Sequence, residues 1–248
     1  MISNPVNGSR YVVRGFGLLS EKSIRPFIII PLIVNILLFS AALFVLFNHL
    51  PNWITSWMSY LPQWLSFLEF LLYPLFAVTA LLGVYYSFNV VANLIAAPFN
   101  GILSEKVEQL VAGRQLEEES WSQILAIVPR TIGRELAKLA YYLPRLALLI
   151  ILSFVPVVNL AAPLLWFLFG AWMMAIQYCD YPMDNNKVSF REMRRILKRQ
   201  RFSAIGFGAL VQLGMMIPLL NLLMMPTAVI GATLYWIDEF ADQASTDS

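Results

Sequence analysis

Residues 26–50 read PFIIIPLIVNILLFSAALFVLFNHL, a run of 25 residues without one charged side chain. A helix of about 20 apolar residues crosses the hydrocarbon core of a bilayer, so this run is long enough to span a membrane. It is also longer than the roughly 7–15-residue apolar core of a cleavable signal peptide. We therefore expect an uncleaved first spanning helix at about residues 24–50.

The charged residues of the chain gather into blocks that alternate with apolar gaps. Only 13% of the 248 residues are charged, against roughly 25% in an average soluble domain. The gaps that lack Asp, Glu, Lys and Arg are residues 26–68, 70–104, 146–179 and 202–237. Each exceeds the roughly 20 residues that cross a bilayer as a helix. The sequence therefore predicts an all-α membrane protein rather than a soluble enzyme.

The second gap predicts a second long helix, from about residue 67 to residue 103. A continuous helix of that length would measure about 54 Å, against roughly 30 Å of hydrocarbon. It must tilt, project from the membrane or break, and we place the break near Pro98. Between the two spanning helices, residues 51–66 hold three tryptophans and a tyrosine. Such side chains favour the headgroup region, so we expect an interfacial loop on the far face.

The last two gaps share a turn pattern. Residues 154–163 read FVPVVNLAAP and residues 216–226 read MIPLLNLLMMP, each with Pro-x-x-Asn-Leu followed by a second proline. The apolar arms beside both turns are shorter than the roughly 17 residues needed to cross. We expect two helical hairpins, over 139–179 and 202–237, that enter the membrane and return, with four full spans as the alternative. Irregular backbone at that depth must be covered, which favours a homo-oligomer.

These elements form one integral membrane domain over residues 1–248. Its polar parts are an amphipathic region at 105–138, a basic segment at 180–201 and a tail at 238–248. With these parts and the N-terminus on one face, all 17 lysines and arginines lie there, and the positive-inside rule makes that face cytoplasmic. The expected fold is two long transmembrane helices, two partly inserted (re-entrant) helical hairpins and amphipathic cytoplasmic helices.

Arg25 is the first candidate for binding an anion. It lies in the first turn of the first spanning helix, where Ser23 is placed to cap that turn. The Arg25 guanidinium and the backbone amides of Ile24 and Arg25 could converge on one tetrahedral oxyanion at the positive end of the helix. A second interpretation fits equally: Arg25 sets the topology and reaches towards lipid phosphates.

A cationic stripe is the second candidate. Arg130, Arg134 and Lys138 recur every four residues and so share one helix face. Glu105 and Glu108, near the end of the second spanning helix, are the expected counter-charges. An ion-paired network at a pore mouth and an ordinary solvated helix surface both fit this pattern.

A third group of cations lies between the two hairpins. Seven of the fifteen residues from 187 to 201 are Lys or Arg. Clusters of this kind commonly rest on anionic lipid, which makes membrane lipids expected partners. Nucleic acid is not an expected partner, because no nucleic-acid-binding fold surrounds the segment.

The residue inventory argues against several chemistries. One histidine, His49, and one cysteine, Cys179, are too few for a zinc site or a Cys–His pair. The chain has no G-x-x-x-x-G-K-[ST] motif, so ATP hydrolysis by the P-loop route is not expected. Apart from Glu69 at a margin, the apolar gaps hold no carboxylate for a proton relay. We expect no metal, no cofactor and no enzymatic activity, which leaves an ATP-independent conduit or a gradient-driven carrier.

Four stretches of the chain resemble the bacterial CysZ sulfate permease family. They read NLIAAPFNGILSE (93–105), YYLPR (141–145), WFLFGAWMMAIQYCDYPMDN (166–185) and MIPLLNL (216–222). The likeness extends from about residue 10 to residue 240. It implies an oligomeric inner-membrane protein that admits sulfate for cysteine biosynthesis. A membrane assembly or lipid-binding protein with a basic cytoplasmic face is the alternative.

The resemblance also implies site residues. The family's sulfate-binding turn, Gly-Ile/Leu-Arg-Arg, matches Ser23, Ile24, Arg25 and Pro26 here, so that one of its two arginines is present. The family's conduction path corresponds to Asn93, Asn100 and Glu105 at the end of the second spanning helix. With Arg130 and Arg134 of the cationic stripe, these residues form the expected pore or ion-pair network.

Overall fold

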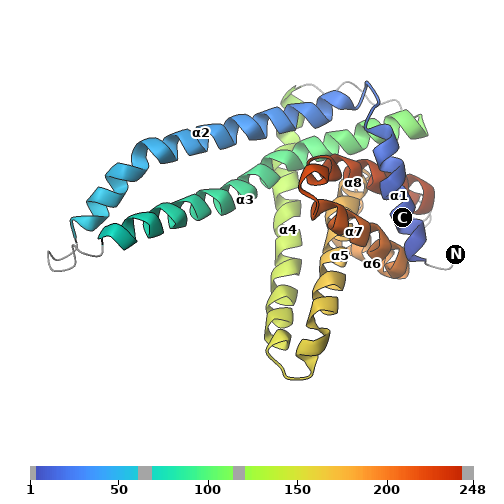
Figure 1. The fold of residues 1–248 in the computed structure, drawn as a ribbon. Helices are drawn as coiled ribbons and strands as arrows, with labels where there is room; N and C mark the ends of the chain where they lie inside the picture. Colours follow the sequence, from blue (N-terminus) through green and yellow to red (C-terminus); the bar gives the residue numbers. More distant parts are fainter. Residues whose placement is uncertain (1–3, 61–68, 114–120, 242–248) are drawn as a thin grey trace. The chain divides into compact units, whose positions relative to one another are not determined.

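The structure is a computed structural model that describes residues 4–60, 69–113 and 121–241, and every regular element in these ranges is a helix. In chain order the helices are α1 (Pro5–Leu18), α2 (Arg25–Met58), α3 (Glu69–Ala112), α4 (Trp121–Ser153), α5 (Val158–Asn185), α6 (Phe190–Arg199), α7 (Arg201–Met215) and α8 (Pro218–Glu239) (Figure 1). Three described segments are long and apolar enough to cross a membrane: Arg25–Ser56, Thr131–Ser153 and Val158–Asn185. The all-α membrane fold expected from the sequence is confirmed.

The chain divides into two compact units. One unit comprises Met1–Ile28 and Ala97–Ser248, and the other comprises Ile29–Ala96. The second unit is built from apolar parts of α2 and α3, and many of its large side chains are exposed, such as Phe44 and Phe47. Extensive exposed apolar surface of this kind is typical of contact with lipid.

Both long helices extend beyond the expected boundaries. Helix α2 continues through Pro51 to Met58, so residues 51–58 are helical, which corrects the predicted interfacial loop. Burial of Ile54 and a hydrogen bond from the Thr55 hydroxyl to the Pro51 carbonyl (2.9 Å) support this last part of the helix. Residues 61–66 of the predicted loop lie outside the described residues.

Helix α3 is continuous past Pro98 and ends at Ala112, so the predicted break is also wrong. A proline removes one backbone hydrogen bond from a helix. Here the helix is held beyond it by packing, because Leu103 and Val107 are almost completely buried in the core of the first unit. The helix therefore carries polar residues of its last turns into that core.

The first hairpin consists of α4 and α5, which run antiparallel on either side of a turn at residues 154–157 (Figure 1). Its membrane-compatible segments are 23 and 28 residues long, so the expectation that these arms are too short to cross is wrong. The apolar runs are shorter than the helices themselves, because helical hydrogen bonding and packing continue past the charged residues Arg145 and Asp180. How deeply the hairpin inserts stays a prediction.

The second hairpin consists of α7 and α8, joined at residues 216–217. With 15 residues, α7 measures about 22 Å, which is less than the hydrocarbon thickness. Helices α1, α5, α7 and α8 enclose the core of the first unit, where Phe207, Tyr235 and Ile176 are fully buried. Helix α1 was not predicted from the sequence, and its Tyr11 and Val12 join this core.

Close helix packing depends on Gly208, which lies where α7 crosses α5. A Cβ atom at this position would overlap with the backbone carbonyl of Ala171. We expect Gly208→Ala to lower stability by about 1–3 kcal/mol, because overpacking forces the helices apart. Thermal unfolding of the detergent-solubilised protein measures this effect.

Gly133 provides the matched control, since a Cβ there meets no atom within 4 Å. Gly133→Ala is expected to raise stability by about 0.5–1 kcal/mol through helix propensity. Equal shifts of the melting temperature in both variants would contradict the α5–α7 contact.

Candidate functional site

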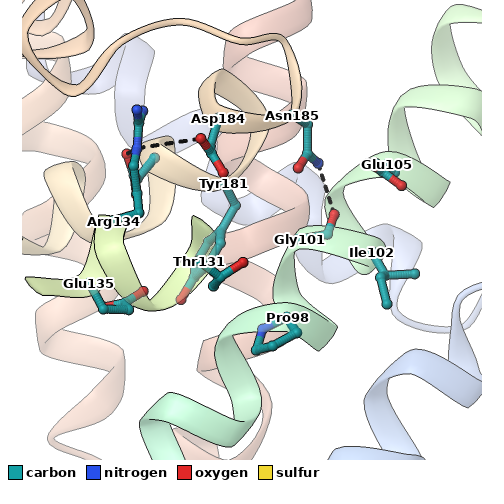
Figure 2. A pocket seen from close by; sticks show the side chains of 11 residues that line it. Pro98, Gly101, Ile102, Glu105, Thr131, Arg134, Glu135, Tyr181, Asp184 and Asn185 are labelled. Atoms are coloured by element: carbon teal, nitrogen blue, oxygen red, sulfur yellow. Dashed lines mark hydrogen bonds and ion pairs between the residues drawn. The ribbon is translucent and has the colours of Figure 1, made fainter. Parts of the chain in front are cut away.

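Three helices of the first unit meet around a small cavity (Figure 2). It is lined by Pro98, Gly101, Ile102 and Glu105 of α3, by Thr131, Arg134 and Glu135 of α4, and by Asp180, Tyr181, Asp184 and Asn185 of α5. Its volume is about 20 Å³. This is room for about one water molecule.

Ion pairs link α4 to α5 at this cavity. Arg134 Nε lies 2.8 Å from Asp180 Oδ1 and 3.6 Å from Asp184 Oδ1. Lys138 Nζ lies 3.3 Å from Asp180 Oδ2 and 2.6 Å from Glu135 Oε1. The spacing explains the pairing: the two cations are four residues apart on α4 and the two aspartates are four residues apart on α5, so each pair shares one helix face.

These charges are buried. The side chains of Asp180, Lys138 and Arg134 are 2%, 4% and 13% exposed. Buried ions are tolerated only with close partners, and here Asp180 provides one carboxylate oxygen to each cation. Arg134 Nη2 is also buried, and no described residue accepts a hydrogen bond from it. The arginine therefore retains a donor that a further acceptor could use.

Amide and hydroxyl groups join α3 to the same end of α5. The Tyr181 hydroxyl accepts hydrogen bonds from Asn100 Nδ2 (3.3 Å) and Gln177 Nε2 (3.0 Å). Asn185 Nδ2 donates to the Gly101 carbonyl at 2.8 Å, as Figure 2 shows. Asn186 Nδ2 donates to both carboxylate oxygens of Glu108, at 3.2 and 3.0 Å. The α5 side chains around the cavity are thus held by hydrogen bonds to α3 and by ion pairs to α4.

The structure brings together three of the five residues expected in a pore or ion-pair network. Glu105 and Arg134 line the cavity, and Asn100 reaches it through Tyr181. Asn93 lies in α3 and Arg130 in α4, and their side chains are outside what the structure describes.

The aspartate partners of the cationic stripe were missed. Arg134 and Lys138 pair with Asp180 and Asp184 of α5 and with the neighbouring Glu135, whereas Glu105 and Glu108 as counter-charges stay a prediction. The signal was available in the stretch DYPMDN (180–185), where two aspartates have the i,i+4 spacing of the stripe. Arg134 and Asp180 are 46 residues apart in the sequence, so their pairing can be recognised only when the hairpin places α5 beside α4.

The turn before α2 differs in part from its expected geometry. Ser23 and Arg25 are exposed and Ile24 is fully buried. The backbone amides of Ile24 and Arg25 both donate to the Glu21 carbonyl, at 3.1 and 3.2 Å. The expectation that these amides are available to an oxyanion is therefore wrong for this conformation, because the turn uses them itself. Binding of an anion by the Arg25 guanidinium stays a prediction.

Together, the apolar helices and the buried charged cavity define an all-α membrane protein with a polar site between its helices. The family described as Sulfate transporter CysZ/Etoposide-induced protein 2.4 matches residues 11–226. The chain belongs to this family, which confirms the resemblance found in the sequence.

Relatives are similar over almost the whole chain. A protein named Sulfate transporter CysZ from Pseudomonas aeruginosa is 48% identical over 240 residues, which cover 96% of this chain and 98% of the relative. Proteins of the same name from Pseudomonas syringae pv. tomato and Pseudomonas fluorescens are 48% and 46% identical over 235 residues. These alignments cover 94% of this chain and 93% and 94% of the relatives.

Proposed function

We propose that this protein is a sulfate permease that admits sulfate across the bacterial inner membrane for cysteine biosynthesis. The observation that carries the proposal is the family membership, with relatives named sulfate transporters that are 46–48% identical from end to end. Transport proceeds without ATP hydrolysis, by a channel-like or gradient-driven route. The N-terminus and the charged segments face the cytoplasm, the two hairpins insert partly, and the protein works as a homo-oligomer.

The charged cavity supports a gate in this pathway. Its described lining holds one cation, Arg134, beside four carboxylates, those of Glu105, Glu135, Asp180 and Asp184. The cavity has room for about one water molecule, which is too little for a sulfate dianion. The described arrangement is therefore closed to sulfate.

Opening requires that Arg134 exchanges partners. Sulfate keeps both charges during passage, so each step must replace its water with N–H donors. Arg134 can offer Nε and Nη2 to an oxyanion once α4 and α5 separate enough to release Asp180 from the guanidinium. Lys138 then holds Asp180 in place, because it already contacts the other carboxylate oxygen. In this mechanism the aspartates and sulfate compete for the same arginine.

Arg25 is proposed to bind sulfate at the membrane face. We expect Arg25→Ala to weaken sulfate binding about 10- to 100-fold, the effect of losing one charge-assisted hydrogen bond of about 1.5–3 kcal/mol. Isothermal titration of sulfate into the purified protein and sulfate uptake into proteoliposomes both measure it. Lys22→Ala is the control, because it removes an exposed positive charge three residues away. Unchanged binding and uptake in the Arg25 variant would exclude Arg25 from the mechanism.

The proposed function is tested by uptake of radiolabelled sulfate into liposomes that contain the purified protein. Protein-free liposomes are the control, and each preparation is measured with and without a pH gradient. Uptake above the control supports a permease, and its dependence on the pH gradient separates a passive channel from a proton-coupled carrier. Vesicles that stay impermeable to sulfate under every gradient would refute the proposal and favour a membrane assembly role.

A further inference from the structure

Two guanidinium groups lie against the same aromatic ring on the first unit. The Arg145 and Arg194 guanidinium carbons are 3.5 and 4.8 Å from the ring centroid of Tyr141 in α4. Phe190, at the start of α6, meets Tyr141 edge-on at 6.1 Å and also lies beneath Arg194, at 4.9 Å. Cation–π contact favours each arginine, but two like charges at one ring repel each other. An anion bound beside both groups would offset this repulsion.

The same side of α6 forms a cationic hollow of about 270 Å³. It is lined by Arg191, Arg194, Arg195 and Lys198. Their i, i+3, i+4 and i+7 spacing places them on one helix face. The opposite face is fixed in the core by Met193, Ile196 and Leu197. Packing of the apolar face therefore keeps the basic face of α6 on the surface of the first unit.

Arg194 links the Tyr141 and Phe190 rings to this hollow. Its Nε atom is buried, and no described residue accepts a hydrogen bond from it. Among the cations that line the hollow, Arg195 is the one with a described ion pair, to Glu192 at 2.6 Å. A buried donor on a charged group is costly unless it is satisfied, so the site is suited to an external oxyanion. Planar guanidinium groups match phosphate oxygens in pairs.

The apolar end of the first hairpin indicates where the anion comes from. Arg145 lies eight residues before Ser153, the last residue of α4, and so about 12 Å from the hairpin turn. One leaflet of hydrocarbon is about 15 Å thick. Between Arg145 and the turn, Leu148 and Ile151 are exposed and apolar. Trp172, whose indole Nε1 donates to the Tyr141 hydroxyl at 3.2 Å, adds an aromatic group suited to the interface.

We infer that Arg145, Arg194 and the basic face of α6 bind the phosphate group of an anionic phospholipid in the cytoplasmic leaflet. This inference rests on the partial insertion of the first hairpin, which places Arg145 at the depth of the lipid phosphates. The lipid phosphate balances the charge of the two arginines and fixes the hairpin at that depth. Binding of the lipid is separate from passage of sulfate, and it can be measured without transport.

Native mass spectrometry of the detergent-solubilised protein tests the inference by titration with phosphatidylglycerol or phosphatidylcholine. We expect tighter binding of phosphatidylglycerol, and a roughly tenfold or greater loss of its affinity in the Arg145→Gln, Arg194→Gln double variant. Arg194→Lys should give an intermediate loss, because it keeps the charge without the planar fork. Arg10→Gln, an exposed change on α1, is the control and should stay within about twofold of the parent affinity.

Three results would contradict the inference. Equal binding of the two lipids, or an equal loss in the Arg10 variant, would overturn the inference and leave only general surface charge. Displacement of phosphatidylglycerol by millimolar inorganic phosphate would make the site one for a free oxyanion and overturn the lipid assignment. Gel filtration and thermal unfolding of the double variant show whether it is folded; if it is not, the Arg194→Lys variant decides.

Discussion

Replacing Asp180 with alanine is expected to destabilise the protein by about 3–5 kcal/mol, the effect of breaking a buried ion pair by removing one partner. Asp180 is 2% exposed and contacts Arg134 and Lys138 with separate oxygens. Its removal leaves two cations that are almost fully buried and adds a cavity between α4 and α5. Thermal unfolding in detergent should show a large drop in melting temperature.

Asp238 offers a matched comparison for this effect. It forms an ion pair with Arg14 at 2.5 Å, but the two side chains are 35% and 50% exposed. Exposed pairs contribute about 0–1 kcal/mol, so Asp238→Ala should change the melting temperature little. Asp180→Asn should fall between the two alanine variants, because the amide keeps a hydrogen-bond acceptor. If Asp180→Ala and Asp238→Ala behave alike, the cluster does not hold α4 to α5.

The sequence predicted the class of fold because apolar runs report directly on contact with lipid. Residues 26–50 became part of α2, and the two proline turns became the ends of two helical hairpins. Helix boundaries were harder to predict. The length of an apolar run indicates how much of a helix lipid covers, whereas the helix itself continues as long as its hydrogen bonds and its packing allow. Helix α3 passes Pro98 for this reason, since residues beyond it are buried in the core.

The site was predicted in Arg134 and Glu105, and its two aspartates were missed. The stripe that contains Arg134 is visible at i+4 spacing within one helix, because both ends of the pattern lie in the same local sequence. Its pairing with Asp180 depends on the hairpin that brings α5 beside α4. The Arg25 turn shows the opposite case: the residues were identified, but the local hydrogen bonds of their amides to Glu21 depend on backbone geometry that residue types do not specify.

Removal of the Arg134 side chain is expected to lower sulfate uptake at least tenfold. Among the described residues that line the cavity it is the one cation, beside four carboxylates. Arg134→Gln removes the guanidinium from the cavity lining, and losing one charge-assisted contact in the barrier state costs about 1.5–3 kcal/mol. Uptake of radiolabelled sulfate into proteoliposomes measures the change, at equal amounts of inserted protein.

Two further variants separate the role of this arginine from its charge. Arg134→Lys keeps the charge but cannot offer the two directed donors Nε and Nη2, so we expect uptake between that of Arg134→Gln and that of the parent protein. Lys106→Gln removes a positive charge from α3 outside the cavity lining and should leave uptake within about twofold. A rise in uptake in Arg134→Gln would show that the arginine only latches α4 to α5. Its pairing with Asp180 would then be a barrier to sulfate, and the donor for the passing anion would have to be sought elsewhere on the route.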